Sequence, residues 1–253
     1  MSDRVAWAPG SPHFLNEGNV SPCLPRLSAA ASIPAESTAS SLLRAQSKRG
    51  RIVKRVGDIV FSLLVLGLGS PLLLLLALVV KVSSKGSVFY CQRRIGRGYK
   101  GFGCLKFRTM RKDADRVLAA VLASDPALRE EFARDFKLKN DPRITPIGRF
   151  LRRSSLDELP QFINVLKGEM SVVGPRPIVW DELERYGRNM DEVLSVRPGL
   201  TGLWQVSGRN NLPYETRVKL DLFYARNRNL WLDLRIVLRT IGVVLLPMDR
   251  GAY

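Results

Sequence analysis

The sequence is poor in the residues that bind transition metals. Its 253 residues include a single histidine, His13, and three cysteines, Cys23, Cys91 and Cys104, without paired or closely repeated spacing. Structural zinc sites need about four such ligands at short, regular intervals. A zinc site is therefore excluded, and a reducing, cytoplasmic setting is the expectation.

Acidic residues are also few. The chain has 23 Asp and Glu against 40 Lys and Arg, which gives a net charge of +17. Such a balance favours anionic partners, namely nucleic acid, anionic lipid headgroups or phosphorylated substrates, although it can also serve only to keep a protein in solution. The chain lacks an aromatic stacking stripe or a recognisable nucleic-acid-reading motif, so a nucleic-acid partner is not expected.

Three regions follow from composition. Residues 1–47 are rich in Ser, Ala and Pro without apolar periodicity, which predicts a disordered tail. They do not form a secretory signal, because no charged segment leads directly into an apolar one. Residues 48–85 hold a basic flank and a long apolar run, and residues 86–253 form the expected globular domain.

The apolar run extends from Ile59 to Val80 and is interrupted by Ser70-Pro71. As a straight helix it would be about 33 Å long, enough to cross a bilayer. Pro71 breaks helix hydrogen bonding near its middle, however, and lysines and arginines flank both ends. Because basic flanks stay in the cytoplasm, the pattern favours a re-entrant membrane helix over a proline-kinked span, which remains the alternative.

The remaining chain predicts a small, helix-rich α+β domain. Residues 87–92 and 103–109 have the composition of short strands around a Gly-rich turn at 96–101, which indicates a β-hairpin. Helices are expected over 113–139, 160–167, 182–186, 214–227 and 231–246, with Gly168 as a C-cap. The last helix is either a core helix or an interfacial one.

An acidic pair, Asp157-Glu158, lies among arginines at 149, 152 and 153. One carboxylate could attack a phosphate, as in aspartyl-phosphate enzymes, and the other could hold Mg²⁺. A structural alternative is that Ser155 and Glu158 form a capping box at a helix start. That alternative does not account for Asp157 or for the crowded arginines.

Two glycine- and proline-containing loops are candidate phosphate or nucleotide loops. Residues 173–177 form a stiff segment that presents Arg176, and residues 197–209 contain several glycines between arginines. Glycines permit close approach of the backbone to a ligand, but such loops are common and each is weak evidence alone.

Taken in order, these segments resemble the bacterial sugar transferases, the monotopic polyprenyl-phosphate phosphoglycosyl transferases. The resemblance covers about residues 50–246 and includes no departure at the positions that matter most. The small size is similar to the exopolysaccharide-type members. The resemblance to the family rests on these motifs: KRVGD at 54–58, the Ser-Pro at 70–71, LKFRTM at 105–110, DPRITPIG at 141–148, SLDELPQ at 155–161, NVLKG at 164–168, VGPRP at 173–177 and the block 197–209.

The resemblance implies a cytoplasm-facing domain on a re-entrant helix at the bacterial inner membrane. It implies Asp157 as the nucleophile that forms a phosphosugar-enzyme intermediate and Glu158 as the Mg²⁺ ligand. Arg152 would hold phosphate and Arg176 would belong to the active-site loop. Further residues expected to bind nucleotide or phosphate are Lys106, Arg108, Arg197, Gln205 and Arg209.

The implied reaction transfers a hexose 1-phosphate from a UDP-sugar to undecaprenyl phosphate and releases UMP, the initiating step of exopolysaccharide synthesis. Galactose is the first expectation for the sugar and glucose the second. Other partners implied are inner-membrane lipids, with a homo-oligomer and polysaccharide-assembly proteins left open. The rival hypotheses are a membrane-attached nucleic-acid-binding protein and a non-catalytic scaffold of polysaccharide assembly.

Overall fold

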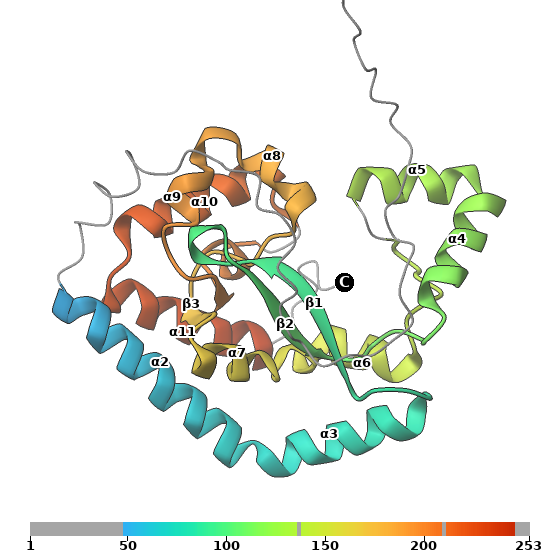
Figure 1. The fold of residues 1–253 in the computed structure, drawn as a ribbon, viewed down its shortest axis with the longest axis horizontal. Coiled ribbons are helices and arrows are strands. Elements are labelled where there is room, and N and C mark those ends of the chain that lie inside the picture. Colours follow the sequence, from blue (N-terminus) through green and yellow to red (C-terminus); the bar gives the residue numbers. More distant parts are fainter. Residues whose placement is uncertain (1–47, 136–137, 209–210, 246–253) are drawn as a thin grey trace, which may run out of the picture.

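The computed structural model describes residues 48–135, 138–208 and 211–245, so the predicted tail at 1–47 lies outside the described residues. The architecture is mostly helical with two small sheets, which confirms the mixed class (Figure 1). Helices are α2 (Lys48–Leu68), α3 (Ser70–Ser83), α4 (Ala114–Ser124), α5 (Pro126–Asp135), α6 (Pro146–Ser154), α7 (Gln161–Lys167), α8 (Leu183–Tyr186), α9 (Met190–Val193), α10 (Tyr214–Asn227) and α11 (Leu230–Leu245). Strands are β1 (Phe89–Ile95), β2 (Gly101–Phe107), β3 (Ser171–Val173) and β4 (Gly199–Thr201).

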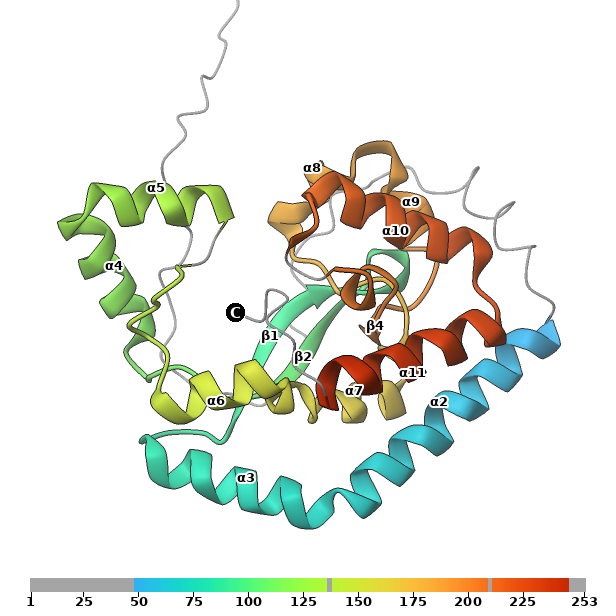
Figure 2. The ribbon, with the colours of Figure 1, turned by 180° about the vertical axis from the view of Figure 1, so that it is seen from behind.

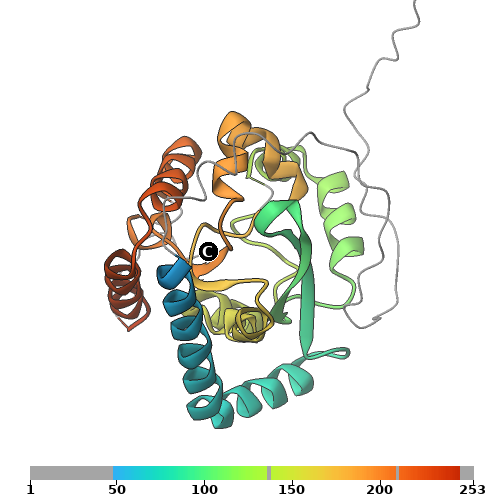
Figure 3. The ribbon, with the colours of Figure 1, turned by 60° about the vertical axis from the view of Figure 1, so that its left-hand side comes forward.

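The apolar run forms two helices, α2 and α3, with a bend of 64° between them (Figure 3). Pro71 lacks the N–H that would donate to the Gly67 carbonyl, and the Ser70 hydroxyl donates to that carbonyl instead at 2.8 Å. The predicted break at Ser70-Pro71 is thus confirmed. Among the described residues, no single helix is long and apolar enough to cross a membrane, whereas the bent pair α2–α3 passes that test together.

The α2–α3 pair leaves much of its apolar surface uncovered. Large side chains such as Leu68, which is 82% exposed, and Leu74 point away from the domain. On the opposite side of α3, Leu76 and Val80 are buried against Phe107 of β2 and Leu151 of α6. The pair therefore has one face packed on the domain and another that is apolar and left exposed by the described residues.

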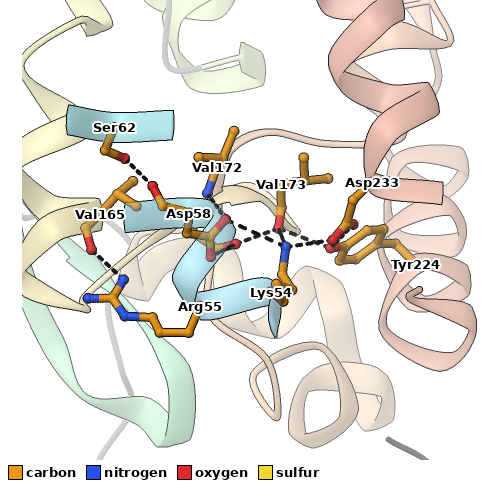
Figure 4. A network of polar contacts seen from close by, with 10 residues as sticks. Lys54, Arg55, Asp58, Ser62, Val165, Val172, Val173, Tyr224 and Asp233 are labelled. Atoms are coloured by element: carbon orange, nitrogen blue, oxygen red, sulfur yellow. Dashed lines mark hydrogen bonds and ion pairs between the residues drawn. The ribbon is translucent and has the colours of Figure 1, made fainter. Parts of the chain in front are cut away.

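Polar side chains fix α2 to the domain (Figure 4). Lys54 donates to the Val173 carbonyl at 3.2 Å and to Asp233 of α11 at 2.7 Å. Asp58 accepts from the Ser171 hydroxyl at 2.8 Å and from the Val172 N–H at 3.2 Å. These bonds join α2 to β3 and α11, and Figure 2 shows α11 running beside α2.

The predicted hairpin is confirmed, with β1 and β2 antiparallel and Lys106 opposite Tyr90. The single helix expected over 113–139 was wrong: α4 ends at Ser124 and α5 begins at Pro126. The break occurs at Asp125, whose carboxylate accepts from the Ala127 N–H at 2.8 Å, ahead of a proline that suits only a helix start. The two helices form an arm that stands away from the rest of the domain (Figure 1).

Strands β3 and β4 pair in parallel, an element that the sequence did not predict. The pairing depends on glycine, because a Cβ at Gly199 would lie 2.1 Å from the Gly174 nitrogen. It brings the carboxyl ends of both strands to one edge. The loop that carries Arg176 follows β3, and the turn η6 (Trp204–Val206) follows β4, so these two segments become neighbours.

The main core lies between this small sheet, α7, α10 and α11. Its members are fully or almost fully buried, and they come from the hairpin as well as from the helices: Cys104, Phe162, Val165, Met170, Val172, Val173, Tyr224 and Ile236. The core therefore packs against β2 through Cys104, and this packing fixes the strand that carries Lys106.

Candidate active site

The acidic pair lies in a tight turn between two helices. Helix α6 ends at Ser154, and its cap residue Ser155 has a left-handed backbone (φ 57°) and donates its N–H back to the Arg152 carbonyl. A 3₁₀ turn, η3 (Leu156–Glu158), follows and leads into α7. The Ser155 side chain makes no capping hydrogen bond, so the capping-box alternative is not found. The turn places Asp157 and Glu158 between the end of α6 and the start of α7.

Asp157 is buried, with 7% of its surface exposed. Burial raises the pKa of its carboxyl to about 6, and the Glu158 carboxylate adds to the rise, while the Lys106 and Arg152 cations oppose it. The group is therefore ionised above pH 6 but held in surroundings that disfavour its charge. A poorly solvated carboxylate of this kind is a better nucleophile than one in water.

Glu158 has the opposite balance. Burial alone would raise its pKa, but the nearby Lys106 and Arg176 cations outweigh burial and hold the pKa below its ordinary value. Its Oε1 atom accepts from Lys106 Nζ at 2.6 Å, and its side chain keeps 31% exposure. Two adjacent carboxylates thus have pKa values moved in opposite directions, as acid–base and nucleophilic sites commonly show.

Glu158 and Lys106 line a small pocket that is open to solvent. Arg176 reaches it from the loop after β3, with its guanidinium 5.8 Å from the centre of the Trp204 ring. Gln205 reaches it from η6. The pocket is lined by Arg94, Cys104, Lys106, Glu158, Gln161, Arg176, Pro177, Gly199, Leu200 and Gln205. Its charge is mostly positive, which suits a diphosphate.

The other predicted residues divide into two groups. Arg152 lies on the α6 side of Asp157, where its Nε donates to the Thr109 hydroxyl at 2.9 Å. Arg108 and Arg197 do not line the pocket: Arg108 donates to the Ser84 carbonyl after α3, and Arg197 donates to the Gly168 carbonyl after α7. Arg209 lies outside the described residues.

Sequence reasoning missed Arg94, Cys104 and Gln161 as pocket residues. The signal for the first two is strand alternation, because Cys104 lies two residues from Lys106 on β2 and so points to the same face. Arg94 pairs with Phe102 on that face and donates to the Pro177 carbonyl at 3.1 Å. It therefore ties the hairpin to the Arg176 loop.

The donor set at the acidic pair fits magnesium better than a tighter-binding metal. Within the described part of the chain, no three His, Cys, Asp or Glu side chains converge on a common point. Magnesium is commonly held by one or two carboxylates together with substrate phosphates and water. An ionised Glu158 at the pocket is a hard oxygen ligand of this kind.

Comparison with known proteins gives a consistent answer. Residues 49–247 match the family described as bacterial sugar transferase. A Haemophilus influenzae protein named as an uncharacterized sugar transferase is 57% identical over 203 residues, which are 80% of this chain and 42% of that relative. The undecaprenyl-phosphate galactose phosphotransferase of Salmonella typhimurium is 52% identical over 216 residues, 84% of this chain and 45% of its own.

Length separates these relatives into two kinds. The chain spans less than half the length of the first curated relatives it matches. By contrast, it is 52% identical over 204 residues to the exopolysaccharide production protein ExoY of Sinorhizobium fredii, which covers 81% of this chain and 89% of that relative. The matched region thus corresponds to nearly all of a short relative and to part of longer ones.

Proposed function

The chain belongs to the bacterial sugar transferase family, and on that premise we propose that it transfers a hexose 1-phosphate from a UDP-sugar to undecaprenyl phosphate and releases UMP. The observation that carries the proposal is the buried Asp157 next to Glu158, because the Glu158–Lys106 ion pair lines a cationic pocket, although Asp157 itself is not among the lining residues. The Salmonella typhimurium relative is named for galactose transfer to this lipid phosphate, which favours galactose over glucose as the sugar.

The proposed reaction has two balanced displacements at one phosphorus atom. An Asp157 oxygen attacks the sugar-bearing phosphorus of the UDP-sugar, the bond to the bridging oxygen breaks, and UMP leaves with the electron pair. Asp157 then carries the sugar phosphate as an acyl phosphate. An oxygen of undecaprenyl phosphate attacks the same phosphorus, which restores the carboxylate and yields a lipid diphosphate sugar.

Two cations from different elements act on Asp157, Lys106 of β2 and Arg152 of α6, and they support separate places for the two substrates. Lys106 and Arg176 line the pocket, where a nucleotide diphosphate would gain charge-assisted hydrogen bonds. Arg152 lies on the α6 side, and α6 packs on α3, so a lipid phosphate would approach from there. Magnesium held by Glu158 would neutralise phosphate charge and make the diphosphate a better electrophile.

The test is UMP release by the purified full-length protein in nanodiscs with undecaprenyl phosphate and magnesium. UDP-galactose, UDP-glucose and their N-acetyl forms are supplied separately. Release is expected with UDP-galactose and requires the lipid phosphate for continued turnover. Release with UDP-glucose alone would reassign the sugar, whereas silence with all four donors would contradict the proposed reaction and favour a scaffold role.

We also propose that α2–α3 enters the cytoplasmic face of the inner membrane and returns. The 64° bend, the uncovered apolar side chains and the basic residues at both ends support this arrangement. A Ser40→Cys variant, in a background lacking the three native cysteines, is expected to resist a membrane-impermeant thiol reagent in intact cells. Permeabilised cells provide the control, in which labelling should occur. Labelling from outside intact cells would instead indicate a span.

A further inference from the structure

The loop that carries Arg176 is attached to the domain through its carbonyl groups. Pro175 and Pro177 flank the arginine, and because proline has no N–H, these two positions can only accept hydrogen bonds. On one side, the Pro175 carbonyl accepts from the Gly199 N–H of β4 at 2.8 Å. On the other side, the Pro177 carbonyl accepts from Nη1 of Arg94 on β1 at 3.1 Å. Arg176 therefore lies between two carbonyls that are held by different sheets.

The Arg94 guanidinium that holds this loop is itself held. Its Nη2 donates to Gln92 Oε1 at 2.8 Å, and its Nη1 lies 3.6 Å from Glu182 Oε2, with only 10% of the side chain exposed. The same Glu182 oxygen accepts from the Val179 N–H at 3.0 Å. A guanidinium is a rigid, planar fork, so it can serve acceptors in several directions at once. Arg94 thus joins the hairpin to the segment 177–182.

The main chain of β1 continues the same attachment. The Ile95 N–H donates to the Ile178 carbonyl at 2.9 Å, which forms an antiparallel bridge between the end of β1 and the loop. Arg94 and Ile95 therefore bind two consecutive carbonyls of the loop. The side-chain bond is the one next to Arg176, so it is the contact of the hairpin that acts most directly on that residue.

Arg94 and Arg176 are also neighbours in the pocket. Both line it, and the pKa of Arg94 is lowered by burial and further by the Arg176 cation. Like charges at one pocket repel each other, and the loop would move away from the hairpin unless bonds opposed that repulsion. The bond from Arg94 to the Pro177 carbonyl opposes it at the point where it acts.

We propose that Arg94 is a positioning residue that fixes the Pro177 carbonyl against the hairpin and thereby places the Arg176 guanidinium to bind the diphosphate of the donor. This role rests on the proposed function and adds a residue to it. Arg94 acts through Arg176 rather than by touching the substrate. Without this bond the loop shifts, and the Arg176 guanidinium loses the geometry that charge-assisted bonds to phosphate require.

The experiment measures UDP binding by calorimetry, with magnesium present, to full-length protein in nanodiscs, and records thermal unfolding of each variant. Arg94→Met is expected to bind UDP about tenfold more weakly. Arg176→Ala should also bind UDP more weakly, and in that background Arg94→Met should have no further effect, because a positioning residue acts only through the group it positions. Arg94→Lys keeps the charge but lacks the fork, so it should bind UDP nearly as weakly as Arg94→Met.

Arg93→Met is the matched control. Arg93 precedes Arg94 on β1, is exposed, and points to the opposite face of the hairpin because side chains alternate along a strand. Its replacement removes the same charge from the same strand without touching the loop. UDP binding by Arg93→Met should equal that of the unaltered protein.

Four results would overturn the inference. Two are normal UDP binding by Arg94→Met or by Arg176→Ala. The third is normal binding by Arg94→Lys, which would assign the effect to charge alone. The fourth is an equal additional loss from Arg94→Met in the Arg176→Ala background, which would mean that Arg94 binds the diphosphate itself.

A second variant keeps the inference testable if Arg94→Met fails to fold. Gln92→Leu removes the acceptor that orients the Arg94 guanidinium, and it must then weaken UDP binding for the inference to stand. If the unaltered protein neither binds UDP nor releases UMP, the proposed function itself has failed, which is a distinct outcome.

Discussion

Replacement of Asp157 by asparagine is expected to abolish UMP release while making the folded protein more stable. The pKa of Asp157 is about 6 in the folded protein, above the value of roughly 4 in an unfolded chain. Folding therefore favours the protonated form, and the ionised form opposes folding above pH 6. Two units of pKa correspond to about 3 kcal/mol, an upper estimate of the stability that the neutral amide restores at neutral pH.

The measurement is the free energy of unfolding of both proteins at pH 4, 6 and 8, alongside UMP release. The advantage of Asp157→Asn should be small at pH 4, grow between pH 4 and 6, and be complete above that range. Asp115→Asn, an exposed position on α4, is the control and should change neither property. Appreciable turnover by Asp157→Asn would remove its assignment as nucleophile, and equal stability at all pH values would contradict the buried charge.

Replacement of Lys106 by methionine is expected to lower turnover by a factor of about 10² to 10³ at pH 7, the usual loss for one electrostatic contact at a reacting centre. Lys106 pairs with Glu158 at 2.6 Å and lowers the pKa of both carboxyls. Without it, a smaller fraction of Asp157 is ionised at neutral pH. The rate of the unaltered enzyme should rise as pH passes through about 6, and the corresponding rise in Lys106→Met should occur at higher pH.

The pH–rate profile from pH 5 to 9 distinguishes this explanation from simple loss of a phosphate contact. A profile lowered equally at every pH, with its rise still near 6, would mean that Lys106 does not control the ionisation of Asp157. Lys112→Met, an exposed position on the segment after β2, should leave the profile unchanged.

The elements that the sequence predicted are those with strong local signals. Pro71 after Ser70 determines the bend, because a missing N–H has the same effect in any surroundings. The hairpin and α7, which ends at the left-handed cap Gly168, likewise depend on signals within a few residues. The acidic pair was identifiable because carboxylates among arginines are unusual in so basic a chain.

The parts that were missed depend on contacts distant in sequence. Strands β3 and β4 are three residues long, too short for alternation to be seen, and they pair only because Gly199 and Gly174 pack backbone against backbone. The sequence likewise does not show which group a charged side chain binds in the folded protein. Arg197 has the composition of a phosphate ligand but binds the Gly168 carbonyl, whereas Arg94 enters the pocket from a strand without any glycine-rich motif.

Packing beneath α6 couples α3, which we propose enters the membrane, to the candidate active site. Leu76 and Val80 of α3 are buried against Leu151 of α6, and Asp157 lies in the turn directly after α6. With α3 in the bilayer as proposed, the immersion depth of this helix sets the height of the nucleophile above the lipid headgroups. A truncation that removed α3 to obtain a water-soluble enzyme would therefore also uncover Leu151 of α6 and Phe107 of β2, the two elements that lead to Asp157 and carry Lys106.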